Sequence, residues 1–433
     1  MKFKAVLLLA FAVFVLSENT YADSERLAPL AEIAVNGSET ESAEAVRKLR
    51  ASGPEGLNAL FDTYTADIDQ FRKNGTMSAK WQKIAAAIDA VAMQKDAYAS
   101  GLYWYTDLDE AKKAAGTAGK PILTLRLLGN LNEEFSCANS RLFRSLLYAN
   151  GDVSKYLRDN YILHWKSVRP APRITIDFGD GRKIERTVTG NSIHYVLDDD
   201  GRIIEALPGL YSPKAFMIYL TQARQVKDAI DGKDRRQQDI ALMRYRKLSF
   251  DRIKARRDVT VKRANVTLTE PSAARVSGLS VDALLAAPVA TTKMAITDEV
   301  SLLRVYDRFY SFEPNIDFSE WQKLADIYSP SPALDEASTA MIRQQTAKTG
   351  LSDAEFQRMF AKLRNFIGLD TTRNDFLYHT RLYEWLNRDP TADLETLNGR
   401  VYAEIFKTPD SDKWLGLYST DVYTALDGNG LTK

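Results

Sequence analysis

The chain has 433 residues, of which 45% are hydrophobic and 27% are charged, and its formal net charge is +1. The length allows about two to four globular domains, and the near-neutral charge gives no support for a nucleic-acid partner. Cys137 is the single cysteine, which excludes an intramolecular disulfide, so stability must come from packed cores.

The first 22 residues have the pattern of a secretory signal peptide. Lys2 and Lys4 precede an unbroken apolar run over residues 5–16, and a small-residue cleavage site ends at Ala22. The run is shorter than the roughly 20 residues that span a bilayer; the alternative is an uncleaved anchor. We therefore predict an exported protein, periplasmic or secreted, with no transmembrane segment after cleavage.

Residues 23–98 are predicted to form a helical N-terminal segment. Apolar residues recur there at three- and four-residue spacing, which is typical of helices with one buried face. The three stretches with this spacing are residues 43–49, 55–64 and 81–97.

Residues 99–226 change character and alternate between short strands and helices. The predicted helices are 107–115, 139–157 and 213–226, and the predicted strands are 122–128, 161–165, 173–178, 182–189, 193–197 and 203–206. The last four strands form two hairpins, because Asp-Gly sits between each pair of alternating runs. This order predicts a mixed sheet with helices packed on it.

The remaining chain is predicted to be mainly helical. Residues 227–300 are divided into a basic helix, 227–263, and a linker rich in Ser, Thr, Ala and Pro. Acidic residues are interleaved in the basic helix, so we predict a solvated face rather than a polyanion site. Residues 301–433 are predicted to be a helical C-terminal domain with an aromatic core.

Several short phrases in residues 104–220 occur in the order that a known fold uses. They are Trp104, Asp109-Glu110-Ala111, Gly119-Lys120-Pro121-Ile122-Leu123, Cys137-x-x-Ser140, Gly190-Asn191-Ser192-Ile193, Val196-Leu197-Asp198 with Gly201, and Pro208-Gly209-Leu210. This region, a little over a quarter of the chain, resembles a thioredoxin-like domain. The whole chain resembles exported bacterial proteins that carry such a domain.

The resemblance implies an α/β fold class, with a thioredoxin-like mixed sheet at 99–226 flanked by a helical N-terminal segment and a helical C-terminal domain. It also implies a reactive cysteine at a helix N-terminus, faced by a cis-proline loop. Here Ser140 replaces the resolving cysteine, and Ser192 occupies the cis-proline position. A cis bond before a non-proline residue costs about 2.5–4 kcal/mol, so we predict a trans bond at Ser192.

The candidate catalytic residues are Cys137, Ser140, Arg141 and Ser192. If Ser136 caps the helix, Cys137 lies in its first turn, where orphan N–H groups and the helix dipole favour a thiolate. Arg141 adds to this effect, and Ser140 donates a hydrogen bond to the sulfur. The alternative, given equal weight, is that Cys137 is a small buried hydrophobic residue.

Two histidines and one arginine are further candidates within the sheet. Residue parity allows His164 and His194 to share one face, which permits a Cys–His–His metal site or a Cys–His nucleophile. Neither histidine has local ligand spacing, so we favour structural roles and predict no metal or cofactor. Arg126 lies inside the apolar central strand and is predicted to pair with Asp177 or Glu133.

Two functions remain open from the sequence. The first is a protein- or peptide-binding or scaffold module, with Cys137 as a monothiol contact. The alternative is a monothiol thiol–disulfide exchange or isomerase-like enzyme, in which Cys137 attacks and an external thiol resolves the adduct. An open cleft with a reactive thiol would favour the enzyme, and a buried Cys137 would favour the binding module.

Overall fold

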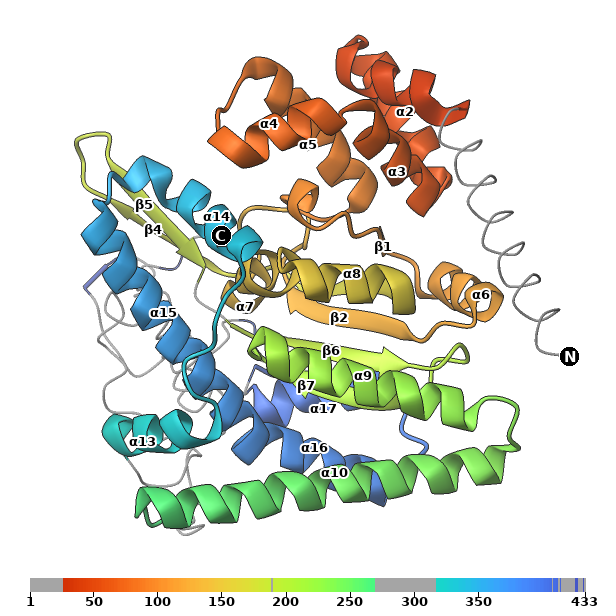
Figure 1. Cartoon of the computed structure of the whole chain (residues 1–433), viewed down its shortest axis with the longest axis vertical. Helices are drawn as coiled ribbons and strands as arrows, with labels where there is room; N and C mark the ends of the chain where they lie inside the picture. Colours follow the sequence, from red (N-terminus) through yellow and green to blue (C-terminus); the bar gives the residue numbers. More distant parts are fainter. Residues whose placement is uncertain are drawn as a thin grey trace, which may run out of the picture.

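The computed structural model describes residues 26–187, 190–268 and 317–406, with 408–411, 413, 425–426 and 431. Over these residues the protein is α/β, and a mixed five-stranded sheet lies among helices from both ends of the chain (Figure 1). The predicted signal peptide and most of the predicted linker lie outside the described residues. Within the described part, no helix combines the length and the apolar character needed to cross a membrane.

The N-terminal helices form a unit with its own hydrophobic core. They are residues 26–36, α2 (Glu39–Ala51), α3 (Pro54–Thr63), α4 (Thr65–Asn74) and α5 (Ala79–Ala92), followed by the short turn η1 (Ala97–Ala99). The helices predicted at 43–49 and 55–64 are confirmed. The third ends at Ala92 because Met93 adopts a left-handed conformation. Gly56 lets α3 approach α2 closely, since a Cβ there would lie 1.9 Å from the Leu49 carbonyl oxygen.

The main sheet has the strand order β1-β3-β2-β6-β7. Its strands are β1 (Trp104–Tyr105), β2 (Ile122–Leu128), β3 (Ile162–Arg169), β6 (Ser192–Leu197) and β7 (Ile203–Pro208). Strands β1, β3 and β2 are parallel, whereas β6 is antiparallel to both β2 and β7. Every residue of β2 is buried, as its mainly apolar sequence predicts for a central strand covered on both faces.

Helices α6 (Leu108–Ala118), α8 (Gly151–Asn160) and α9 (Pro213–Ile230) pack against the strands. The prediction of one continuous helix over 139–157 is wrong. This stretch is divided into α7 (Ala138–Leu142), a π-helical turn η2 (Phe143–Tyr148) and α8. The break occurs at Asn150, whose side chain starts α8 by accepting a hydrogen bond from the Val153 amide.

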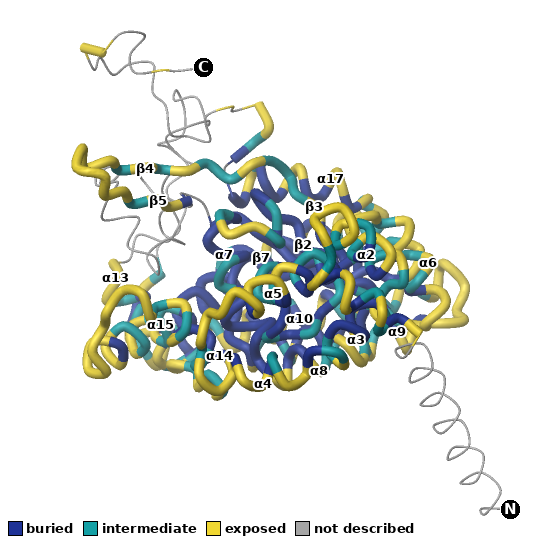
Figure 2. The backbone as a smooth tube through the Cα atoms, turned by 90° about the horizontal axis from the view of Figure 1, so that it is seen from above, coloured by how far each residue is buried: buried dark blue, intermediate teal, exposed yellow. Residues whose placement is uncertain are grey.

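The predicted hairpin at 173–189 is confirmed as β4 (Arg173–Asp177) and β5 (Lys183–Thr187). It forms a separate two-stranded sheet and does not extend the main one. Figure 2 shows the hairpin projecting from the body of the molecule with mostly exposed residues. Because residues 173–187 form this hairpin and not a helix, they do not cover a face of the main sheet, and another part of the chain covers it.

The C-terminal helices provide that cover. They are α10 (Arg235–Ala264), α13 (Phe318–Tyr328), α14 (Glu336–Thr346), η6 (Ala347–Thr349), α15 (Asp353–Arg373), η7 (Asn374–His379), α16 (Thr380–Arg388), α17 (Leu394–Arg400) and η8 (Val401–Ile405). Many of their buried apolar residues join those of the sheet in one core, whereas those of α13 form a separate cluster with Leu369 and Phe376. In Figure 1, α8 and α9 lie in front of the sheet and α17 lies behind it.

Candidate functional site

Cys137 is fully buried at the point where the loop after β2 enters α7. It is the N-cap residue itself, and its backbone N–H donates to the Leu128 carbonyl oxygen at 3.0 Å. The expectation that Ser136 caps this helix is therefore wrong. The Ser136 side chain is also buried, and its hydroxyl has no hydrogen-bond partner among the described residues.

Two of the three other predicted site residues surround the thiol. The sulfur lies 2.7 Å from the Ser192 hydroxyl and 3.3 Å from the Ser140 hydroxyl, and it donates to the Asn191 carbonyl oxygen at 3.7 Å. The peptide bond at Ser192 is trans, as predicted. Arg141 instead donates to the Thr187 hydroxyl at 2.9 Å.

The C-terminal segment closes the Cys137 site from the other side. The hydroxyl of Tyr402, in η8, donates to the same Asn191 carbonyl oxygen at 3.1 Å. The Asn191 side-chain amide donates to the Thr408 hydroxyl at 3.1 Å, and both C-terminal residues are buried. A cysteine that a thioredoxin-like fold would expose is thus covered by residues from the far end of the chain.

His164 and His194 lie on opposite faces of the sheet, so the expectation that they share one face is wrong. His164 is opposite Thr124 of β2 and His194 is opposite Leu125, and successive strand residues point to opposite faces. His164 Nδ1 contacts the Thr124 hydroxyl at 2.7 Å, and His194 Nε2 contacts the Tyr148 hydroxyl at 2.6 Å. Among the described residues, no group of His, Cys, Asp and Glu is arranged to hold a metal ion.

Burial controls the protonation of both histidines. It lowers the pKa of His164 to about 3, with a further contribution from the Arg126 guanidinium. Burial alone lowers the pKa of His194 to about 3. Both imidazoles are therefore neutral at physiological pH and act as hydrogen-bonded core residues.

Arg126 is buried and forms an ion pair, but both predicted partners are wrong and the actual one has a 55% exposed side chain. Its guanidinium lies 2.9 Å from Glu395, at the start of α17, and also donates to the Thr124 hydroxyl at 2.8 Å. Asp177 instead pairs with Lys183 across the projecting hairpin. The actual partner is supplied by the helix that covers this face of the sheet.

Removing the Glu395 carboxylate should leave the buried Arg126 charge poorly compensated. We expect Glu395→Gln to lower the free energy of unfolding by about 1–2 kcal/mol, the range of a hydrogen bond to a charged group. The matched control is Glu404→Gln, which breaks an exposed pair with Arg400 and should cost below about 0.5 kcal/mol. Urea denaturation of both variants measures the difference, and equal costs would contradict a stabilising role for the buried pair.

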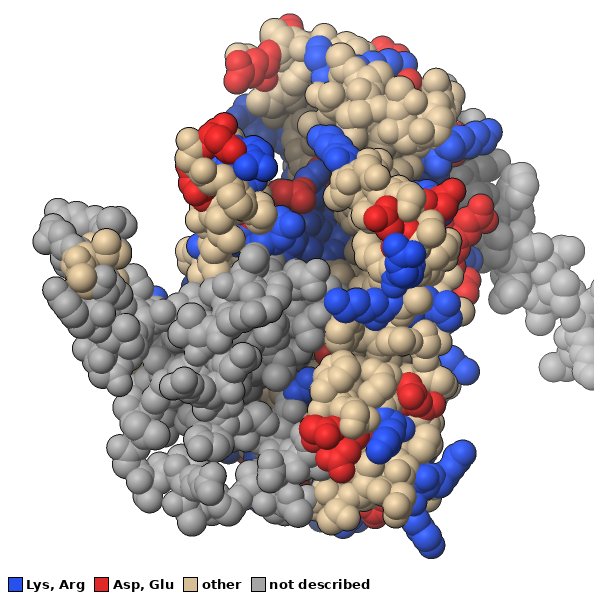
Figure 3. Space-filling view, turned by 90° about the vertical axis from the view of Figure 1, so that its left-hand side faces the viewer, with Lys and Arg blue, Asp and Glu red and all other residues tan. Residues whose placement is uncertain are grey.

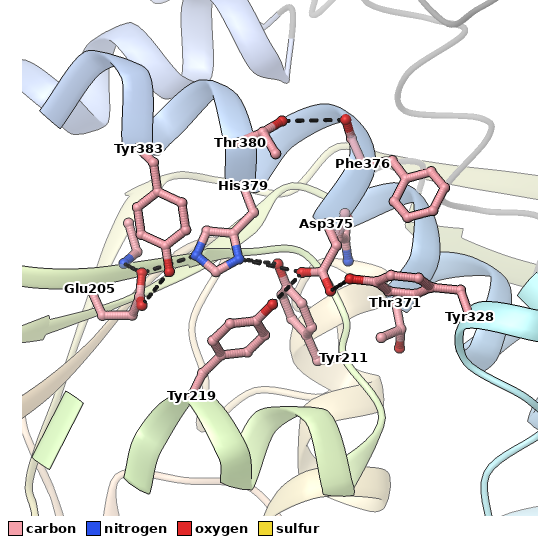
Figure 4. A network of polar contacts seen from close by, with 12 residues as sticks. Glu205, Tyr211, Tyr219, Tyr328, Thr371, Asp375, Phe376, His379, Thr380 and Tyr383 are labelled. Atoms are coloured by element: carbon pink, nitrogen blue, oxygen red, sulfur yellow. Dashed lines mark hydrogen bonds and ion pairs between the residues drawn. The ribbon is translucent and has the colours of Figure 1, made fainter. Parts of the chain in front are cut away.

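A second polar cluster joins the sheet to the C-terminal helices, and the sequence analysis did not identify it. His379 Nε2 lies 2.9 Å from Glu205 of β7, and His379 Nδ1 lies 3.4 Å from Asp375 (Figure 4). All three side chains are buried. The available signal was a carboxylate, Glu205, inside the apolar strand 203–208.

Tyrosine hydroxyls donate further hydrogen bonds to both carboxylates. Tyr383 and Tyr245 donate to Glu205, and Tyr219 and Tyr328 donate to Asp375. In Figure 4 the ring of Tyr383 lies beside Glu205, and those of Tyr219 and Tyr328 lie beside Asp375. Each buried carboxylate therefore has hydrogen-bond donors in addition to the histidine, which is what a buried charge requires.

The cluster holds its histidine in the charged form. Burial opposes the charge, but the carboxylates of Glu205 and Asp375 raise the pKa of His379 to about 9. Burial would likewise raise the pKa of Glu205, but the His379 charge and the hydrogen bonds to it lower that pKa below its usual value. With both nitrogens engaged and the ring charged, His379 is poorly suited to act as a general base.

A cavity of about 500 Å³ adjoins this cluster between α9, α10, the end of α13 and η7. Asp375, Tyr219 and Tyr328 form part of its wall, and Figure 4 shows them side by side. Its volume lies within the usual range for ligand-binding pockets, about 300–1,000 Å³. Buried Cys137 is not among its lining residues.

Charged side chains of both signs occur on the face that carries the β4–β5 hairpin and α15. Figure 3 shows acidic and basic side chains interspersed over much of this face, with basic side chains gathered in one recess. This mixture agrees with the near-neutral net charge of the chain.

Comparison of the chain with family models, with curated proteins and with solved structures finds no match. Its function must therefore be inferred from its own residues and their geometry.

Proposed function

We propose that the protein is an exported thioredoxin-like binding module that recognises a protein or peptide without thiol chemistry. The strand order β1-β3-β2-β6-β7 supports the thioredoxin-like assignment, as does a helix that begins at a cysteine after the central strand. The contact between Cys137 and Ser192 supports it as well, because the family places its cis-proline loop against the cysteine. The signal-like sequence at residues 1–22 supports export to the periplasm or medium.

One observation carries the choice of a binding module over an enzyme: Cys137 has no exposed surface. A thiol must meet its disulfide substrate to exchange with it. Here Tyr402 and Asn191 close the site, and Ser140 provides no second thiol. We assign ligand recognition to the cavity beside α9 and α10.

The test is the rate of Cys137 alkylation against pH on the native mature protein. We expect negligible labelling until urea unfolds the chain, because a buried thiol reacts through opening of the structure. Ala43→Cys introduces a thiol at an exposed position of α2 and should label at the rate of a free thiol under the same conditions.

A Ser140→Cys variant sharpens this test. Its new thiol would lie beside Cys137 in the same buried site, so both thiols should stay unreactive in the native state. Fast labelling of Cys137 with a midpoint well below about pH 8.5, the free-thiol value, would instead support the monothiol enzyme and defeat the binding-only proposal.

A further inference from the structure

Basic side chains are concentrated around the cavity beside α9 and α10. Lys214, Arg252 and Arg256 all line it, and among the described lining residues the single carboxylate belongs to Asp375. That carboxylate is already engaged by Tyr219 and Tyr328 and by the charged histidine behind it. The charge facing the cavity is therefore predominantly positive.

The three cations differ in how they are held. Arg256 is fixed, since its guanidinium donates to the Tyr328 carbonyl oxygen at 3.0 Å and lies 4.1 Å from the centre of the Tyr328 ring. Lys214 and Arg252 have no ion pair or hydrogen bond with any residue that the structure describes. Two cations are thus available to a ligand beside a third that is pre-positioned.

A buried hydroxyl in the wall also lacks a partner. Ser249 lines the cavity and is 3% exposed, and its hydroxyl makes no hydrogen bond of ordinary geometry within the described chain, its one neighbour of this kind being the more distant Tyr245 hydroxyl. Buried hydroxyls normally have a hydrogen-bond partner, so an isolated one calls for an explanation. A ligand oxygen in the cavity would supply it.

The start of α9 contributes further positive potential. Ser212 caps this 18-residue helix, and both Ser212 and Lys214 line the cavity. A helix N-terminus carries a partial positive charge, which favours anions. Apolar side chains complete the wall, among them Ile218, Ile253 and Pro330.

We propose that this cavity binds a carboxylate attached to an apolar group, as at the C-terminal residue of a peptide. The carboxylate is recognised by Lys214, Arg252 and the Ser249 hydroxyl, and the apolar group lies against Ile218 and Ile253. Carboxylates match guanidinium groups in charge and planar geometry. This inference rests on the proposed binding function and names its ligand chemistry.

The test uses the full mature chain and a fluorescent hexapeptide that ends in leucine, either as the free acid or as the amide. We expect fluorescence anisotropy to show binding of the acid and at least about tenfold weaker binding of the amide, because a hydrogen-bonded charge is lost. Equal binding of both peptides would overturn the carboxylate inference and leave the peptide-binding function standing.

Calorimetry with N-acetyl-leucine distinguishes the two possible sources of the carboxylate, a peptide C-terminus and a small free acid. If it binds and neither peptide does, the ligand is a small free acid: carboxylate recognition stands and the peptide-binding function fails. If none of the three probes binds, both the inference and the assignment of recognition to this cavity are wrong.

Variants locate the site. Arg252→Gln and Lys214→Gln should each weaken acid binding about tenfold. The matched control is Lys254→Gln, because Lys254 is exposed and lies about 200° from Arg252 around α10; it should bind normally. Equal weakening by Lys254→Gln would show nonspecific charge attraction and overturn the proposal.

Ser249→Ala provides a second readout. It should weaken acid binding with little change in the melting temperature of the ligand-free protein, because the hydroxyl it removes makes no internal hydrogen bond of ordinary geometry. Unchanged affinity would remove Ser249 from the site. A lower melting temperature together with unchanged affinity would make its role purely structural.

Discussion

Replacing Glu205 by Gln is expected to lower the free energy of unfolding by about 3–5 kcal/mol, the cost of breaking a buried ion pair. The variant would leave the His379 imidazolium with only Asp375 as a charged partner in a fully buried site. The hydrogen bonds from Tyr245 and Tyr383 can persist to the Gln carbonyl oxygen, but the Gln amide NH2 then faces two donors, His379 Nε2 and the Ala206 N–H. The effect therefore combines the lost charge with lost hydrogen bonds. Urea denaturation at pH 7 measures it.

The control is Glu384→Gln on α16, an exposed position near the same cluster, where the change should stay within about 0.5 kcal/mol. The double variant Glu205→Gln with His379→Gln should cost less than the sum of the single variants, because no buried charge is left unpaired. If Glu205→Gln is no worse than Glu384→Gln, the Glu205–His379 pair does not stabilise the contact between β7 and η7.

The second large effect is expected on the acid side of neutrality. Burial lowers the pKa values of His164 and His194 to about 3 in the folded protein, against about 6.5 for an unfolded chain. Between these values the unfolded state binds protons that the folded state excludes. Stability should therefore fall as pH falls from 6.5 towards 3, by about 1.4 kcal/mol per pH unit for each histidine.

Other groups of the fold extend this profile in both directions. The lowered pKa of Glu205 adds a loss of stability as pH falls below its unfolded value and through its folded value. The pKa of His379 is raised to about 9, so its contribution is complete below about pH 6.5 and is lost as pH rises through 9. Maximum stability is expected between the acid loss below about pH 6.5 and the alkaline loss towards pH 9.

Urea denaturation at pH 5, 7 and 9 of the wild type, His194→Gln and His379→Gln tests this assignment. His194→Gln should reduce the acid slope by about 1.4 kcal/mol per pH unit and leave the alkaline loss in place. His379→Gln should remove the alkaline loss and leave the acid slope from His164 and His194 in place. An acid slope that His194→Gln does not change would show that His194 binds its proton equally in both states, so that burial does not lower its pKa.

Local sequence patterns were sufficient for much of the sheet. The run 122–128 is apolar except for Thr124 and Arg126, and only a central strand covered on both faces buries every residue in this way. The Asp-Gly turns predicted both hairpins, because their φ > 0 positions are encoded by the residues in the turn itself. The proximity of Cys137 and Ser192 was likewise implied by the order of short motifs.

Contacts between distant segments were decided by the tertiary structure. The sequence shows that Arg126 is a charge in an apolar strand, but its partner Glu395 is 269 residues away. The same holds for Tyr402 over the Cys137 site and for His379, which is 174 residues from Glu205. Periodicity reports which face of an element is buried and does not specify which distant helix covers it. The sequence of this protein therefore determined most of its strands, its turns and the position of its thiol motif. The packing of the C-terminal helices onto the sheet decided that the thiol is buried and that a basic cavity opens beside α9.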